Sequence, residues 1–288
     1  RVHMPVHAVP HLPPSQRPAL TAVSDERQAQ WIGQREKLLS MTSRRPGGKE
    51  FESNATIPRS GHVDESLVEY QQAMWESNNG PELEPMLASG AIALLDAHWL
   101  IAYYEQGGRR LGRRQDLPPE AFMSLGELKA AGTPSFGLPC ILLSYMWLQP
   151  DHPDPHGDTL RSLVSVLKLY TCRSPETFTS YGNSTLGPGG TQRWGVFIDY
   201  VSMHQHKSQS TRRAASEDEL FRTALNSLDR LYSHPKLTVL RMTKKPAGYP
   251  TNYDVPKGAN VAEYMDRGWP FLETCLAHLC KGREKVLD

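Results

Sequence analysis

The chain of 288 residues is 39% hydrophobic, so it is long enough to bury a real core in one large domain or two small ones. Its 32 Lys and Arg residues nearly balance its 31 Asp and Glu residues, which favours neither nucleic acid nor an anionic membrane as a partner. The longest apolar runs, such as 92–95 and 138–143, are far shorter than the roughly 20 residues of a membrane-spanning helix, so we expect no transmembrane segment.

Residues 1–62 are predicted to be a Pro-rich extended tail, one helix and a linker. The first 20 residues hold five prolines, which lack an amide donor and disfavour helical geometry in the residue before them. Ser24 is typical of an N-cap, and the acidic residues after it favour a helix to about Met41. Residues 42–62 combine Gly, Pro and Ser without apolar periodicity, which is typical of a linker.

Residues 63–138 are predicted to form a helical region before the main domain. Helices are expected over 63–75 and 88–106, and in the second the apolar residues recur at intervals of three and four. The next loop holds a basic cluster of Arg109, Arg110, Arg113 and Arg114. We interpret this cluster as part of a solvated loop, and the alternative is a site for a phosphate or an acidic partner.

Residues 139–288 are predicted to be an α/β domain. Three short apolar runs predict buried strands over 140–145, 194–199 and 237–242. Helices with one apolar stripe are expected between them over 158–170 and 216–232, and a final helix is expected from Trp269 and Pro270. This alternation predicts a doubly wound parallel sheet with flavodoxin-like layering, preceded by the helical region and the tail.

No metal site or cofactor is predicted. The four cysteines form no CxxC pair, so we expect reduced, mostly buried thiols in an intracellular protein. The loop over 151–158 has two histidines and three carboxylates, but its prolines favour a rigid loop in which Asp158 caps the next helix. The chain begins at Arg1 rather than Met, which is consistent with a fragment or with a processed product, including one processed in an organelle.

Polar and aromatic side chains gather where the predicted strands end and the last helix begins. In an open parallel sheet, ligands bind beyond the carboxyl ends of the strands, so these side chains form the candidate pocket. The candidates are Ser144, Tyr145, Trp147, Asp199, Gln205, Arg267, Trp269 and Glu273.

Three motifs in this region resemble the TIR and heterokaryon-incompatibility (HET) superfamily. LLSYMW at 142–147 is similar to the HET pattern LSYxW and to the first-strand TIR pattern FxSY. VFIDYVSMHQ at 196–205 resembles IDxxxxxQ of HET and FxD of TIR, and RGWPFLE at 267–273 resembles RGWxxxE and WCxxE. The resemblance covers residues 139–281. The chain is also similar to uncharacterised algal-protist proteins that carry RRQDLP, MWLQPDHPDP and DRGW motifs.

The resemblance implies that Glu273 is catalytic and lies beside Trp269 in a pocket closed by Ser144, Tyr145 and Asp199. The implied reaction cleaves the nicotinamide-ribose bond of NAD, which would be the substrate, because a carboxylate stabilises an oxocarbenium-like state. The chain departs from the TIR pattern in having Pro270 after the tryptophan and in ending where that family adds strands. The alternative role for Glu273 is structural, in the first turn of its own helix and paired with Arg267.

Two functions therefore follow from the resemblance. The first is an interaction or scaffold subunit of a larger assembly, which binds protein partners through the N-terminal tail and the TIR/HET-like domain. Residues 1–62 have no core of their own, and such segments become ordered on a partner, which favours this function. The alternative is an NAD glycohydrolase that uses Glu273.

Overall fold

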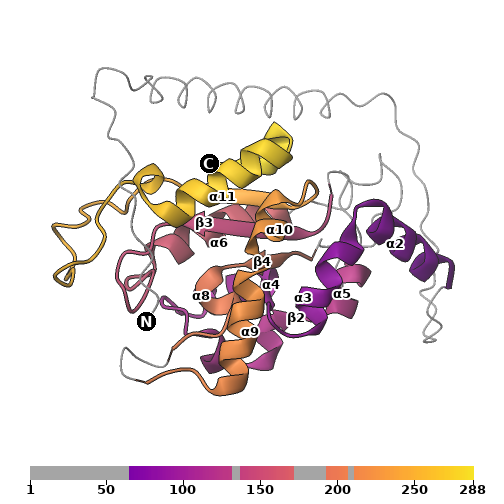
Figure 1. The fold of residues 1–288 in the computed structure, drawn as a ribbon, viewed down its shortest axis with the longest axis horizontal. Helices are drawn as coiled ribbons and strands as arrows, with labels where there is room; N and C mark the ends of the chain where they lie inside the picture. Colours follow the sequence, from indigo (N-terminus) through magenta and orange to yellow (C-terminus); the bar gives the residue numbers. More distant parts are fainter. Residues whose placement is uncertain (1–64, 132–136, 172–192, 207–210) are drawn as a thin grey trace, which may run out of the picture. The chain divides into compact units, whose positions relative to one another are not determined.

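A mixed six-stranded sheet with the order β2-β1-β4-β3-β5-β6 organises the part of the chain that the computed structural model describes (Figure 1). That part comprises residues 65–131, 137–171, 193–206 and 211–288. The expected tail, first helix and linker of 1–62 lie outside the described residues. The strands are β1 (Leu94–Asp96), β2 (Phe122–Met123), β3 (Cys140–Tyr145), β4 (Gly195–Phe197), β5 (Thr238–Met242) and β6 (Val286–Leu287).

The three predicted strands are confirmed as neighbours that run parallel. β3 lies between the other two, with Leu142 opposite Phe197 in β4 and opposite Val239 in β5. Every residue of β3 is buried, as expected for a central strand covered on both faces. The carboxyl ends of β3 and β4 therefore meet at the same edge of the sheet.

Two antiparallel strands at one side make the sheet mixed rather than wholly parallel, which corrects the prediction. β1 pairs antiparallel with β4, and β2 pairs antiparallel with β1. Both strands come from the region that we expected to be helical, and they fall in the same compact unit as the rest of the sheet. At the opposite side β6 pairs parallel with β5, so the last residues extend the sheet.

The helix predicted over 88–106 is wrong in its first half, because Asp96 ends a strand and begins α4 (Ala97–Glu105). Its carboxylate accepts the amides of His98 at 2.7 Å and Trp99 at 3.4 Å, which caps the helix. The same buried carboxylate forms an ion pair with Arg193. Because the helix begins only after Asp96, the apolar residues Leu94 and Leu95 before it pair in the sheet as β1.

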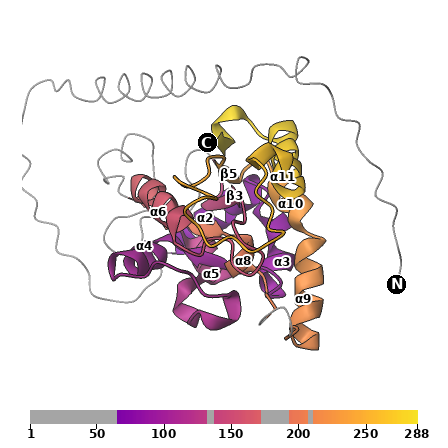
Figure 2. The same cartoon turned by 90° about the vertical axis from the view of Figure 1, so that its left-hand side faces the viewer.

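Helices cover both faces of the sheet, and the two faces have separate cores. Leu143 of β3 packs against α6 and α4 on one face, whereas Leu142 faces the other, as the period of two in a strand requires. Figure 2 shows α4 and α6 opposite α10 and α11. The remaining helices are α2 (Glu65–Ser77), α3 (Glu84–Ala88), α5 (Leu125–Ala130), α6 (Asp158–Thr171), α8 (Asp199–Ser202), α9 (Ala215–Leu225), α10 (Leu228–Ser233) and α11 (Gly268–Cys280).

Two smaller expectations also need correction. The helix predicted over 216–232 is divided into α9 and α10, and the Ser227 hydroxyl at the division bonds back to the carbonyl of Thr223 at 2.8 Å. Of the described cysteines, Cys140 is buried as expected, but Cys280 is exposed and Cys275 is half-buried.

Asp96→Ala should lower the free energy of unfolding by roughly 2–4 kcal/mol, because it removes a helix cap and leaves Arg193 without this buried carboxylate. Urea denaturation measures the change. Glu105→Ala, at the other end of α4, is the matched control, since its ion pair with Lys168 is exposed and should contribute about 1 kcal/mol or less. Equal losses in the two variants would contradict this account of α4.

Candidate functional site

The candidate site lies where β3 and β4 end, and Asp199 joins the two strand ends. Asp199 is the first residue of α8, separated by one residue from the end of β4. Its two carboxylate oxygens accept the Tyr145 hydroxyl and the Trp147 indole N–H, each at 2.9 Å, and its own helix supplies the amide of Tyr200 at 2.6 Å. Removal from water raises the pKa of Asp199 despite these donors. Tyr145, Trp147 and Asp199, three of the predicted candidates, therefore lie together at the strand ends.

A second group of polar side chains connects Ser144 to α11. Ser144 is fully buried, and its hydroxyl donates to Glu273 and lies 2.5 Å from the Tyr264 hydroxyl. The Tyr264 hydroxyl continues to Thr274 at 3.3 Å. Helix α11 therefore attaches to the central strand through a connected set of hydroxyl and carboxyl groups.

Glu273 is 9% exposed, and its burial has a direct consequence for its charge. Loss of hydration raises the pKa of Glu273 to about 8, and the nearby Asp199 adds to the rise, whereas the Ser144 and Tyr232 hydroxyls oppose it. At neutral pH the carboxyl is therefore mainly protonated. A protonated carboxyl cannot supply the negative charge that an oxocarbenium-like state requires.

Trp269 does not close a pocket with Glu273. Its side chain is 53% exposed on the first turn of α11, whereas the carboxyl of Glu273 is enclosed by Ser144 and its neighbours. Arg267 does not pair with Glu273 in the described structure. Its guanidinium donates instead to the carbonyls of Trp147 at 2.5 Å, Asn260 at 2.6 Å and Ala262 at 3.0 Å.

Gln205 holds the loop after α8 rather than facing the strand ends. Its amide nitrogen donates to the carbonyls of Asp199 at 3.2 Å and Met203 at 3.3 Å. Gln115 bonds to both main-chain polar groups of Gln205, at 2.8 Å and 3.2 Å. Gln115, Tyr264 and Thr274 are not among the predicted site residues. Gln115 lies in the RRQDLP motif, to which no role was assigned, and Tyr264 and Thr274 lie outside the predicted strand ends and the quoted motifs.

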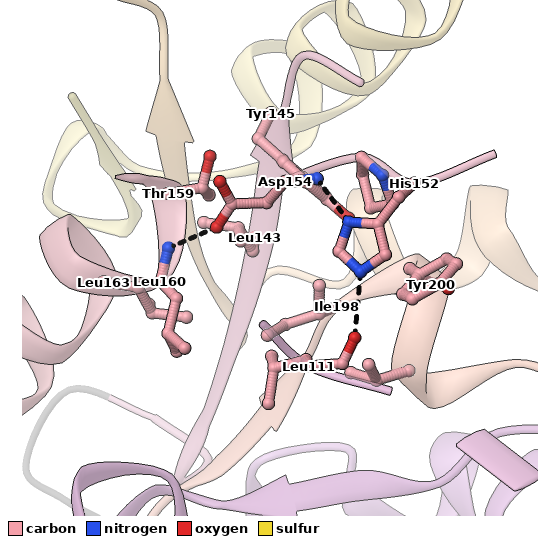
Figure 3. A pocket seen from close by; sticks show the side chains of 12 residues that line it. Leu111, Leu143, Tyr145, His152, Asp154, Thr159, Leu160, Leu163, Ile198 and Tyr200 are labelled. Carbon is pink, nitrogen blue, oxygen red and sulfur yellow. Dashed lines mark hydrogen bonds between the residues drawn. The ribbon is translucent and has the colours of Figure 1, made fainter. Parts of the chain in front are cut away.

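The loop over 151–158 is held in place by hydrogen bonds to the main chain. No metal-ligand cluster occurs among the described residues. The His152 ring contacts the Leu111 carbonyl at 2.9 Å and accepts the Asp154 amide at 3.0 Å (Figure 3). Asp154 accepts the Leu160 amide at 2.8 Å, so it caps the first turn of α6 in place of the predicted Asp158. The prediction of a rigid loop is supported, with the capping residue corrected.

A small hollow lies between this loop, β3 and α8. It has a volume of about 20 Å³, and its lining includes Tyr145, Asp154 and Tyr200 but not Glu273. One carboxylate oxygen of Asp154 is buried there without a hydrogen-bond partner. A space of this size accommodates one water and excludes a nucleotide.

Comparison with known proteins adds no family to this description. No protein-family model matches the chain, and neither a curated protein nor a solved structure matches it. The TIR/HET resemblance therefore stays a prediction from the three motifs.

The buried Glu273 should make the stability of the protein depend on pH. The pKa of Glu273 is about 8 in the folded protein, against 4.5 for an ordinary glutamate. Between these two pH values Glu273 ionises in the unfolded chain but stays protonated in the folded protein. The free energy of unfolding of the wild type should therefore fall as the pH rises from 4.5 to 8. Glu273→Gln removes this pH dependence, which amounts to about 1.4 kcal/mol per pH unit. The difference in free energy of unfolding between Glu273→Gln and the wild type should therefore increase, in favour of the variant, by roughly 2–4 kcal/mol from pH 5 to pH 8.

Denaturant unfolding at several pH values measures this difference. The exposed Glu219→Gln on α9 controls for the loss of one negative charge and should follow the wild type at every pH. A Glu273→Gln curve that stays parallel to the wild type would show that Glu273 is ionised in the folded protein.

Proposed function

We propose that the chain is an interaction subunit of a larger assembly and that the outward face of α11 binds a protein partner. The observation that carries this proposal is where the apolar side chains of α11 lie. Of the nine large hydrophobic side chains that are exposed among the described residues, six lie between Val261 and Leu279. Four of them, Trp269, Phe271, Leu272 and Leu279, lie on α11, and Val261 and Met265 lie in the segment before it. We call these six residues the α11 surface.

The polar residues of α11 account for this arrangement. Glu273 and Thr274 face inward to the buried hydroxyl groups, so the helix turns Phe271, Leu272 and Leu279 outward. A surface helix normally shows the opposite distribution, with apolar side chains inward and polar ones in water. An apolar patch on a helix that is already anchored is typical of a protein-protein contact.

A protein suits the α11 surface better than a membrane does. The net charge of the whole chain is +1, which gives little attraction to anionic lipid. None of the described helices is long and apolar enough to cross a membrane. A row of large side chains along one helix matches an apolar groove or helix face of a partner.

The alternative NAD glycohydrolase rests on the motif resemblance alone. Its catalytic role needs an ionised Glu273 that borders a cleft, whereas Glu273 is buried with a pKa of about 8. The enclosed carboxyl instead supports a role in holding α11 against β3.

Leu279→Glu should release the chain from its assembly, because Leu279, in the last turn of α11, is 82% exposed and a charge there opposes desolvation. The tagged chain is expressed in its native cells and sized by native gel filtration of the extract. We expect the wild type to elute far above 32.3 kDa and Leu279→Glu to elute near that mass. Leu169→Glu, on the 57% exposed Leu169 of α6, should elute as the wild type does.

Both variants should keep the stability of the purified chain within about 0.5 kcal/mol, because both sites are on the surface. Elution of the wild type at the monomer mass, or loss of the assembly in the Leu169→Glu variant alone, would contradict the proposal. Retention on lipid vesicles instead of on a protein would assign the α11 surface to a membrane.

Incubation of the purified protein with NAD distinguishes the two functions. We expect no release of nicotinamide at pH 7, alone or in the native assembly, because Glu273 is mainly protonated there. Release that disappears in Glu273→Gln would establish the enzyme and assign catalysis to this carboxyl.

A further inference from the structure

A second feature, which involves no residue of α11, is a hollow with one charged side chain at its wall. The hollow has a volume of about 120 Å³ and lies beside β1, β2 and α5. Its lining residues are Leu87, Gly90, Ile92, Ala93, Leu94, Arg114, Met123, Ser124, Leu125 and Leu128, and we call it the Arg114 hollow.

Arg114 is fixed in place but only partly satisfied. Its Nη1 donates to the carbonyls of Ala91 at 3.0 Å and Ser202 at 3.2 Å, while a guanidinium has five N–H donors in all. No ion pair of Arg114 occurs within the described ranges, whereas the adjacent Arg113 pairs with Asp116 at 2.7 Å. Burial lowers the pKa of Arg114, since its hydration is reduced without a carboxylate in compensation.

Because Gly90 has no side chain, the space beside Nη2 of Arg114 is open. A methyl group built at Gly90 would meet only Nη2 of Arg114, at 3.9 Å. Ser124 is the other polar lining residue, and its hydroxyl already bonds to Glu127 at 2.9 Å. Glu127 is in turn paired with Arg193, so Arg114 supplies the free charge at this hollow.

We propose that the Arg114 hollow binds a small organic monocarboxylate with a short apolar chain. The carboxylate takes the unused N–H groups of Arg114, and the chain packs on Ile92, Met123 and Leu128. A volume of 120 Å³ equals that of roughly four waters in the liquid, which is room for a carboxyl group and a short branched chain. A phosphate dianion fits less well, because Arg114 is the one charged side chain in the lining and would leave the second negative charge without a cation.

Calorimetric titration of the full chain with isovalerate at pH 7 tests this site, with neutral isovaleramide as the isosteric comparison. We expect saturable binding of isovalerate, and binding at least tenfold weaker for the amide. Labelled methionine methyl groups give a local reading, because the signal of Met123 should shift as isovalerate saturates. A short peptide that ends in a free valine distinguishes a free acid from a chain-terminal carboxylate.

Two variants locate the site by independent means. Arg114→Lys removes the forked donors and should weaken isovalerate at least tenfold. Leu87→Trp fills the hollow from its half-buried rim without touching the carbonyl contacts of Arg114, and it should have the same effect. Arg113→Lys, whose partner is Asp116, should bind as the wild type does. Equal affinity for acid and amide, undiminished binding in Leu87→Trp, or no saturable binding of any probe would overturn the proposal.

Discussion

The burial of the Ser144 and Glu273 side chains is the constraint on which the arrangement of the carboxyl edge depends. A polar group that leaves water must find partners inside the protein, or its burial costs several kcal/mol. Ser144 is fully buried because β3 is covered on both faces, so its hydroxyl fixes the position of the α11 carboxyl and of Tyr264. Asp199 imposes the same requirement one strand away, where Tyr145 and Trp147 satisfy it.

The charge state of Glu273 connects this constraint to function. A protonated carboxyl can both accept from Ser144 and donate a proton, so it satisfies a buried site without a counterion. Catalysis of glycosidic cleavage would require the opposite arrangement, with an ionised carboxylate exposed to substrate. The same anchor also sets the rotation of α11, and that rotation leaves Phe271, Leu272 and Leu279 in water. The closed interior and the apolar exterior of α11 therefore have one cause.

Much of the parallel core could be predicted from sequence, because β3, β4 and β5 lie within the apolar runs at 140–145, 194–199 and 237–242 that stand out from the helices between them. β1, β2 and β6 are two or three residues long and carry no period of their own, so only pairing with a neighbour identifies them. The proximity of Tyr145 to Asp199 followed from strand direction, whereas Ser144 belongs to a separate group with Tyr264 and Glu273. The state of Glu273 and the exposure of Trp269 depend on how α11 is rotated and buried, which a list of motif residues does not contain.

Arg267 and Arg114 both donate to main-chain carbonyls, but Arg267 completes a structure whereas Arg114 leaves donors open for a ligand. Arg267 donates from each of its three nitrogens to a different carbonyl, so no nitrogen is left without a partner and its position beside the strand ends is structural. Arg114 gives a single nitrogen to two carbonyls. Its remaining donors face a hollow whose other lining residues are mainly Leu, Ile and Met. An arginine that is anchored at one nitrogen and open at the others is held in the geometry that a bidentate carboxylate needs, and that pre-organisation distinguishes Arg114 from Arg267.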